Sequence, residues 1–173
     1  MARPKVRGAA KDLSQVTAID WARLAAFIDG EGHIAINENK SPAGRYYQYI
    51  RVIITNTDTR LIAWLFETFG GSLLRGHVSE KHRRVYKWAV SCRHAEAILL
   101  QCYAYFITKQ DQAEIALAFQ QTIKDKTYRK GTEIPEEIRA LRVAYREQLR
   151  QARHQRHVEI HRDAHGNVTQ VTH

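Results

Sequence analysis

The sequence predicts an α+β fold in which helices pack on an antiparallel sheet. Runs with alternating apolar residues occur in pairs joined by turn-like segments, and runs with helical spacing separate and follow these pairs. The length of 173 residues and the hydrophobic content of 44% suffice for one core and exclude general disorder. The expected core order is therefore αββαββα, with a basic helix added toward the C-terminus.

The first helix is expected to begin after Thr17 and to end at Gly30 or Gly32. Thr17 and Asp20 have the spacing of a capping box, and apolar residues then recur on one helical face: Trp21, Leu24, Ala25 and Ile28. Residues 1–13 are basic and lack periodicity, which fits either a flexible arm that follows a phosphate backbone or an unstructured tail.

Changes in periodicity define the elements that follow. The segment NKSPAG separates two alternating runs, which predicts a long hairpin, and a later helical run stops at Gly70 and Gly71. The elements expected after the first helix are, in order, strands at 33–37 and 45–56, a helix at 61–69, strands at 72–78 and 85–91, and helices at 94–103, 109–123 and 135–157.

The two faces of the predicted hairpin differ in chemistry. One face is apolar, whereas the other carries amides, aromatic rings and a guanidinium group: His33, Asn37, Asn39, Tyr47, Tyr49 and Arg51. Asn and Arg match the donor and acceptor pairs on base edges, so this polar face suits the reading of a DNA groove. An ordinary solvated sheet face has the same pattern, and both interpretations stay open at this point.

The predicted helix at 135–157 carries a row of arginines at steps of three and four residues: Arg139, Arg142, Arg146, Arg150, Arg153 and Arg156. Ile138, Leu141, Tyr145 and Leu149 are expected to form its apolar back. A solvated helix face would more often mix charges of both signs. The row therefore favours contact with phosphates.

The composition of the chain indicates which kinds of binding partner and which cellular compartment to expect. Lys and Arg number 27 against 18 Asp and Glu, which gives a formal charge of +9 and favours a polyanionic partner. No run approaches the roughly 18 apolar residues of a membrane span, and the N-terminus lacks a signal-peptide core. Cys92 and Cys102 form no CxxC pair, so a disulfide framework is not indicated. An intracellular protein is expected, with bacterial cytoplasm and organelle both open.

Residues 24–32 (LAAFIDGEG) resemble the signature of the LAGLIDADG homing endonucleases. The resemblance extends to residues 54–71 (ITNTDTRLIAWLFETFGG) and to residues 103–117 (YAYFITKQDQAEIAL), and it covers roughly residues 21–120. It implies a saddle-shaped antiparallel sheet in an endonuclease domain at 14–134. A basic arm at 1–13 and an Arg-rich helix and tail at 135–173 would flank that domain.

The resemblance also implies roles for individual residues. Glu31 and the backbone carbonyl of Gly30 would bind Mg²⁺, or another divalent cation such as Mn²⁺ or Ca²⁺. Asn56 falls where the family places an amide that positions water, and Lys109 where the family has a lysine beside the active site. Asp29 is expected to have a structural, hydrogen-bonding role.

A composite active site needs two signature copies, and the chain has one. A homodimer packed through residues 21–30 is therefore expected, with an interface of Trp21, Leu24, Ala25, Ala26, Ile28 and Asp29. The double-stranded DNA target would be long and pseudo-palindromic, and Arg75, His77 and Lys87 would extend the base-reading surface. Neither a membrane nor a small-molecule substrate is expected.

The function that these features predict is metal-dependent, site-specific cleavage of DNA in intron or intein homing. An RNA-splicing maturase and an inactive DNA-binding regulator of the same family remain alternatives, although retention of Glu31, Asn56 and Lys109 argues against the regulator. Two other patterns are interpreted as incidental. These are a histidine row at His154, His157 and His161, and the set Cys92, His94 and Cys102.

Overall fold

A computed structural model describes residues 5–7, 11–40, 46–75, 84–124, 134–154, 158–162 and 168–172. Its α-helices are α1 (Ala18–Glu31), α2 (Thr59–Phe69), α3 (Cys92–Cys102), α4 (Gln110–Lys124) and α5 (Glu136–His154). Its strands are β1 (Lys5–Arg7), β2 (Gly32–Lys40), β3 (Tyr46–Asn56), β4 (Ser72–Arg75), β5 (Tyr86–Ser91), β6 (Val158–Arg162) and β7 (Val168–Thr172). Short 3-10 turns occupy Leu13–Gln15 (η1) and Tyr103–Tyr105 (η2). None of the described helices combines the length and apolarity needed to cross a membrane.

The main sheet has the strand order β1-β4-β5-β3-β2, and every neighbouring pair is antiparallel. This arrangement confirms the α+β class and the αββαββα order of the core. Strand β1 differs from the expected flexible arm or unstructured tail, because Lys5–Arg7 pairs with β4 and becomes an edge of the sheet.

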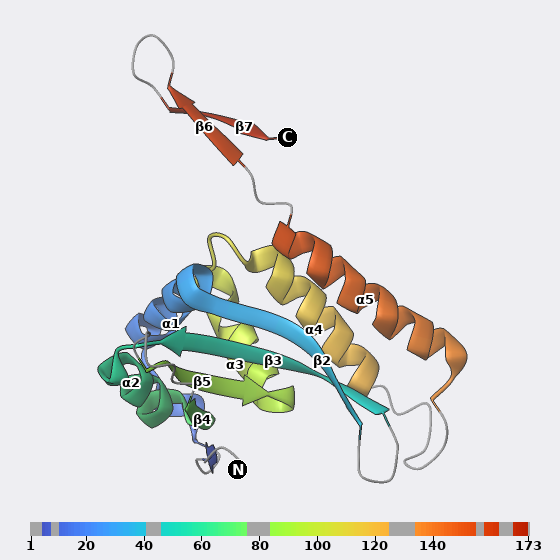
Figure 1. Cartoon of the computed structure of the whole chain (residues 1–173), viewed down its shortest axis with the longest axis horizontal. Helices are drawn as coiled ribbons and strands as arrows, with labels where there is room; N and C mark the ends of the chain where they lie inside the picture. Colours follow the sequence, from blue (N-terminus) through green and yellow to red (C-terminus); the bar gives the residue numbers. More distant parts are fainter. Residues whose placement is uncertain are drawn as a thin grey trace.

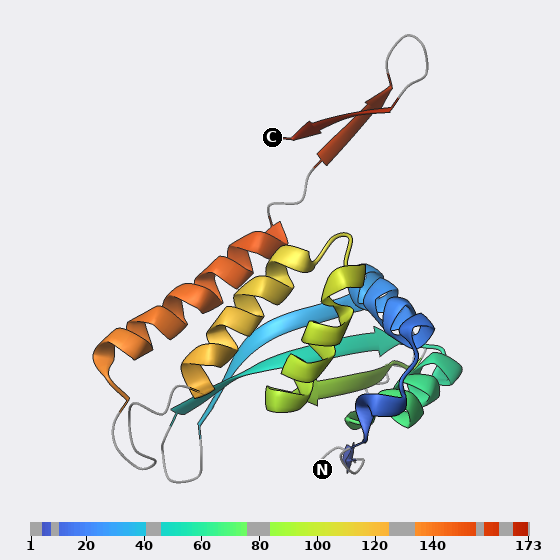
Figure 2. The same ribbon diagram turned by 180° about the vertical axis from the view of Figure 1, so that it is seen from behind.

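Helices α1 to α4 cover one face of the sheet, and none of the described helices covers the opposite face (Figures 1 and 2). Alternation along β2 and β3 explains this two-sided structure, because alternate residues of a strand point to opposite faces. The residues of β3 that face the helices are fully buried, among them Ile50, Val52 and Ile54. Ile54 lies opposite Trp88 of β5, which belongs to the same core. We call the uncovered side the front face.

Helix α1 has well-defined ends. At its start, the hydroxyl of Thr17 accepts the backbone N–H of Asp20 and donates to the Asp20 carboxylate at 2.7 Å. At its end, the backbone N–H of Gly32 bonds to the carbonyl of Ile28. A Cβ atom at Gly32 would lie 2.5 Å from the Ile28 Cα atom, so only glycine allows β2 to start this close to the helix.

Helix α5 packs along α4 and reaches strand β2 (Figure 1). It buries Arg142, Leu149 and Ala152 and leaves Leu141 41% exposed, so its inward face is rotated from the expected apolar back. The Arg142 guanidinium donates to the hydroxyl and the carbonyl of Thr122, at 3.0 and 2.7 Å. Arg142 therefore holds α5 on α4 and is not a phosphate contact, because the protein itself covers it.

The other described arginines of the row also contact the protein. Arg153 is half-buried and donates to the backbone carbonyl of Ile34 in β2. Exposed ion pairs are formed by Arg139 with Glu136, Arg146 with Glu38 and Arg150 with Glu147, at 3.4, 3.6 and 2.8 Å. Pairs of this kind contribute about 0–1 kcal/mol each, so replacing one of them by contact with another anion costs little free energy. Arg156 lies outside the described residues.

The second strand pair corrects one expected surface. Arg75 is in register with Tyr86, whereas Lys87 is in register with Leu74, so Arg75 and Lys87 belong to rows on opposite faces of the sheet. Lys87 falls on the front face and Arg75 does not. His77 lies outside the described residues.

The C-terminal tail forms a separate two-stranded sheet. Strands β6 and β7 pair antiparallel, with Val158 opposite Thr172 and Arg162 opposite Val168. Figure 1 shows it beyond the C-terminal end of α5, away from the main sheet.

Candidate active site

Glu31 is the last residue of α1 and is exposed where the helix passes into β2. The C-terminal end of β3 reaches the same place, because β2 and β3 pair along their whole length. There the Nδ2 atom of Asn56, the last residue of β3, donates to the Oε2 atom of Glu31 at 2.5 Å. The sheet therefore brings together two of the three residues that the signature resemblance selects.

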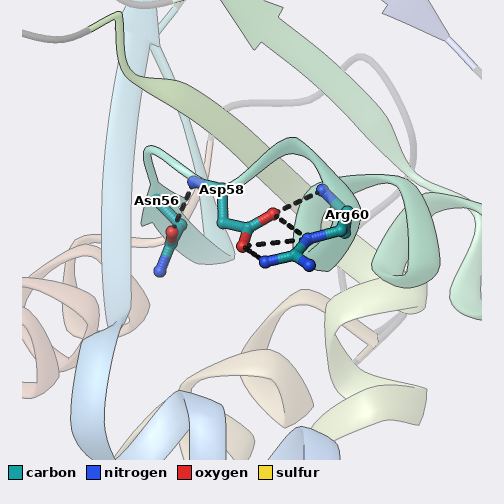
Figure 3. Close-up of polar contacts among 3 residues, drawn as sticks. All are labelled: Asn56, Asp58 and Arg60. Carbon is teal, nitrogen blue, oxygen red and sulfur yellow. Dashed lines mark hydrogen bonds and ion pairs between the residues drawn. The ribbon is translucent and has the colours of Figure 1, made fainter.

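The orientation of the Asn56 amide is fixed from its other side (Figure 3). Its Oδ1 atom accepts the backbone N–H of Asp58 at 2.7 Å, which leaves the NH₂ group to face Glu31. Asp58 in turn accepts the backbone N–H and the guanidinium of Arg60. The side-chain bond from Arg60, followed by its backbone bond, lowers the pKa of Asp58 to about 2.

Asp58 was not singled out from the sequence, although its N-cap position before α2 is a recognisable signal. The side chain of Arg60 is 90% exposed in its pair with Asp58. The turn between β3 and α2 thus forms a chain of contacts that leads from Arg60 through Asp58 and Asn56 to Glu31.

Asp29 binds the loop that connects η2 to α4. Its carboxylate accepts the backbone N–H groups of Ile107, Thr108 and Lys109 at 2.7, 3.2 and 3.0 Å. It also accepts the Thr108 hydroxyl at 3.1 Å. These contacts agree with the hydrogen-bonding role expected for Asp29, and they leave its carboxylate committed to the protein itself.

Lys109 lies at the C-terminal end of α1. Its ammonium donates to the carbonyls of Ile28, Asp29 and Gly32 at 2.5, 2.8 and 2.8 Å. A cation here is favoured, because the last carbonyls of a helix lack intrahelical donors and carry the negative end of the helix dipole. The third candidate thus shares the helix end with Glu31.

Arg153 adds positive charge at the start of β2, where His33 lies. Burial lowers the pKa of His33, and the charges of Arg153 and Lys109 lower it further. Burial likewise lowers the pKa of the Arg153 guanidinium. Arg153 comes from the far end of α5, beyond the segment that carries the family resemblance, so its approach to β2 is a property of the tertiary structure.

One chain offers a partial site for a divalent cation. Glu31 supplies an exposed carboxylate and Gly30 a carbonyl at the same helix end, and hard cations such as Mg²⁺ prefer oxygen ligands of both types. Among the described residues, no three His, Cys, Asp or Glu side chains gather closely enough to hold a metal alone. The residues fit a cation that takes its remaining ligands from elsewhere, such as a second copy, a phosphate or water.

The front face carries the polar side chains expected from the alternation. Asn39 donates to the hydroxyls of Tyr47 and Tyr49 at 3.4 and 3.0 Å, and the two tyrosine rings stack 5.9 Å apart. Arg51 and Asn37 are half-buried nearby, and the Nε atom of Arg51 is buried without a hydrogen-bond partner. The face therefore presents amide, phenol and guanidinium groups, and hydrogen bonds from Asn39 link its two tyrosines.

The expected dimer interface requires correction. Trp21, Leu24, Ala25 and Ile28 are at most 6% exposed, because they form part of the core under the chain's own sheet. Their side chains have no surface to offer to a second copy. The outer face of α1 instead presents Ala26 and Gly30, and no heavy atom lies within 4 Å of a Cβ added at Gly30.

No protein-family model and no curated protein matches the sequence. Solved structures do resemble the fold. The archaeal intron-encoded homing endonuclease I-Vdi141I complexed with DNA aligns with a TM-score of 0.61 and 13% identity, over 78% of this chain and 84% of that one. The homing endonuclease I-CvuI in complex with its target, in the presence of calcium, aligns with a TM-score of 0.54 and 14% identity, over 74% and 95%.

The LAGLIDADG meganuclease I-AabMI bound to uncleaved DNA aligns with a TM-score of 0.55 and 24% identity, over 72% of this chain. The aligned part is 44% of I-AabMI, so this chain corresponds to less than half of that protein. The protein therefore has the fold of the LAGLIDADG homing endonucleases, in agreement with the resemblance of its signature residues.

Proposed function

We propose that this protein is a metal-dependent DNA endonuclease that hydrolyses phosphodiester bonds as a homodimer. The observation that carries the proposal is the pairing of Glu31 with Asn56 at the exposed end of α1. A carboxylate held in one orientation beside an open helix end is suited to bind a hard cation at a phosphate. The fold shared with DNA-bound homing endonucleases supports the same chemistry.

Glu31 and the carbonyl of Gly30 are the proposed metal ligands. When bound, Mg²⁺ would stabilise the attacking and leaving oxygens of the phosphodiester. Asn56 keeps the Glu31 carboxylate in place through its N–H group, and its own amide is held by Asp58. Lys109 adds positive charge at the helix end, where negative charge develops on the phosphate.

The front face is the proposed DNA-reading surface. Its residues supply base-edge donors and acceptors, and the formal charge of +9 favours a duplex over a neutral partner. The residues proposed to face bases are His33, Asn37, Asn39, Tyr47, Tyr49, Arg51 and Lys87. Arg139 and Arg146 of α5 are the proposed phosphate contacts.

The partial metal site supports the proposed homodimer. One chain supplies a single signature helix, and two helix ends placed side by side would bring two Glu31 carboxylates to one duplex. The small exposed residues Ala26 and Gly30 permit close approach of a second α1. Ile107, which is 90% exposed beside the end of α1, provides apolar surface for the same contact.

A role in intron or intein homing is the proposed biological setting, and it places the protein where DNA is found, inside the cell. The intron-encoded protein I-Vdi141I, which shares the fold, is the comparison that supports it. A homing target is the uninterrupted form of the insertion site. The DNA that flanks the open reading frame therefore gives the test substrate.

Cleavage of that substrate in magnesium tests the function. The parent chain should cut both strands, and Glu31→Gln should lose cutting while DNA binding largely survives, because the amide keeps the shape and removes the charge. Glu137→Gln, an exposed change on α5, is the matched control. Cutting by Glu31→Gln at the parent rate would overturn the ligand assignment. Splicing of a host intron without DNA cleavage would favour a maturase.

A further inference from the structure

Two elements distant in the sequence hold each other at the end of α1. Asp29 in the helix accepts three backbone N–H groups from residues 107–109, and Lys109 in that loop donates to three carbonyls around the helix end. The contact is reciprocal, because each partner supplies the groups that the other lacks. Glu31 lies between Asp29 and Gly32, both of which take part in this contact.

The hydrogen-bonding capacity of the Lys109 ammonium is matched by its surroundings. A lysine ammonium has three N–H donors, and the carbonyls of Ile28, Asp29 and Gly32 accept from it at 2.5–2.8 Å. The N–H groups of Lys109 therefore point at the backbone segment that carries Gly30 and Glu31. The geometry thus ties the ammonium to the position of that backbone.

The Asp29 carboxylate is equally committed. Oδ2 accepts from Ile107, and Oδ1 accepts from the backbone of Thr108 and Lys109. Both oxygens therefore face N–H donors. Replacing the carboxylate by an amide would set an NH₂ group against an N–H in either orientation, so even the nearly isosteric Asn should disturb the loop.

We infer that Asp29 and Lys109 form a positioning pair, through which the loop at 107–109 sets the place of Glu31. Lys109 acts by anchoring the end of α1, and Asp29 acts through Lys109. This inference deepens the proposed function and rests on it for its kinetic consequence. Displacement of a catalytic group by about 1 Å can cost on the order of a hundredfold in rate, so loss of the positioning pair should have a measurable effect on DNA cleavage.

The positioning pair can be tested without any measurement of DNA cleavage. In ¹H–¹⁵N spectra of lysine ammonium groups, Lys109 should give a signal with slowed hydrogen exchange, identified by its loss in Lys109→Met. Asp29→Asn should remove or shift that signal. Asp20→Asn, a matched change at the other end of α1, should leave it in place. A Lys109 signal unchanged by Asp29→Asn would overturn the inference.

A double-mutant cycle tests the kinetic consequence. In single-turnover cleavage, Asp29→Asn and Lys109→Met should each slow cutting on the order of a hundredfold, and the double variant should be no slower than Lys109→Met. Lys109→Arg should not restore cutting, because a planar guanidinium does not match three converging carbonyls. Fully additive losses, or rescue by Arg, would overturn the inference. If the parent chain cuts no DNA, the proposed function fails, whereas the ¹H–¹⁵N spectra still test whether Asp29 and Lys109 form a positioning pair.

Discussion

The Nδ2 atom of Asn56 lies 2.5 Å from the Oε2 atom of Glu31, across 25 positions of sequence. The two residues end different elements, α1 and β3, and they meet because β2 starts directly after α1 and pairs back along β3. The contact is therefore a product of the hairpin register. It gives the exposed Glu31 carboxylate at the end of α1 a fixed orientation.

Removing this contact should weaken metal use more than DNA binding. Asn56→Ala leaves the Glu31 carboxylate without its N–H donor, and loss of such a supporting contact typically costs about 10–100-fold in metal affinity or activity. Titration of cleavage with Mg²⁺ measures the effect, with the exposed neighbour Thr57→Ala as control. An unchanged Mg²⁺ dependence in Asn56→Ala would show that the contact has no role in the reaction.

The two glycines that flank Glu31 should respond in opposite ways. Gly32→Ala puts a Cβ atom 2.5 Å from the Ile28 backbone, and overpacking of this kind costs about 1–3 kcal/mol or more of folding stability. Gly30→Ala meets open space in the single chain and gains up to about 1 kcal/mol of helix propensity. Thermal unfolding distinguishes them.

In sedimentation experiments, Gly30→Ala should nevertheless weaken association, because the added methyl group stands where a second helix would approach. Equal association of Gly30→Ala and the parent chain would argue against an α1 interface.

Arg142 and Arg146 should separate stability from DNA binding. Arg142→Ala removes two hydrogen bonds to the buried Thr122 and should cost about 1–3 kcal/mol of unfolding free energy, with no change in the salt slope of binding. Arg146→Ala should change stability by less than about 0.5 kcal/mol and reduce the salt slope by about one. Denaturant unfolding and binding at several salt concentrations measure the two effects. The reverse pattern would show that the two arginines had been assigned the wrong roles.

Cys102 should make stability fall at high pH. Burial, with a smaller effect of the Asp29 charge, raises the pKa of this thiol from 9.0 to about 12. The unfolded chain therefore loses its proton first. The protonated thiol makes its full contribution to the free energy of unfolding below about pH 9. This contribution is lost as pH rises toward 12, by at most about 1.4 kcal/mol per pH unit.

Unfolding free energies of the parent chain and Cys102→Ala, measured across this range, should differ in slope, because the other groups titrate alike in both proteins. Parallel curves would contradict the buried position of the thiol.

Helical spacing alone could not orient α5. The arginine row and the apolar row lie on adjacent faces of the same helix, and a small rotation exchanges which residues are covered. Contact with Thr122 of α4 decided the rotation, so Arg142 became buried and Leu141 exposed. The same limit applies to α1, whose apolar stripe was assigned to a second copy although the chain's own sheet covers it.

The element order of the αββαββα core and the ends of α1 could be predicted from the sequence, because caps and periodicity are local properties. The family resemblance grouped Glu31, Asn56 and Lys109 as candidates. The sequence also indicated the polar front face, since alternation in a hairpin follows from the pleat. The tertiary structure alone decided which strand rows align, as for Arg75 and Lys87, and which groups meet across long separations. Asp29 and Lys109 are 80 positions apart, and only the packing of the loop after η2 against the end of α1 brings them into contact.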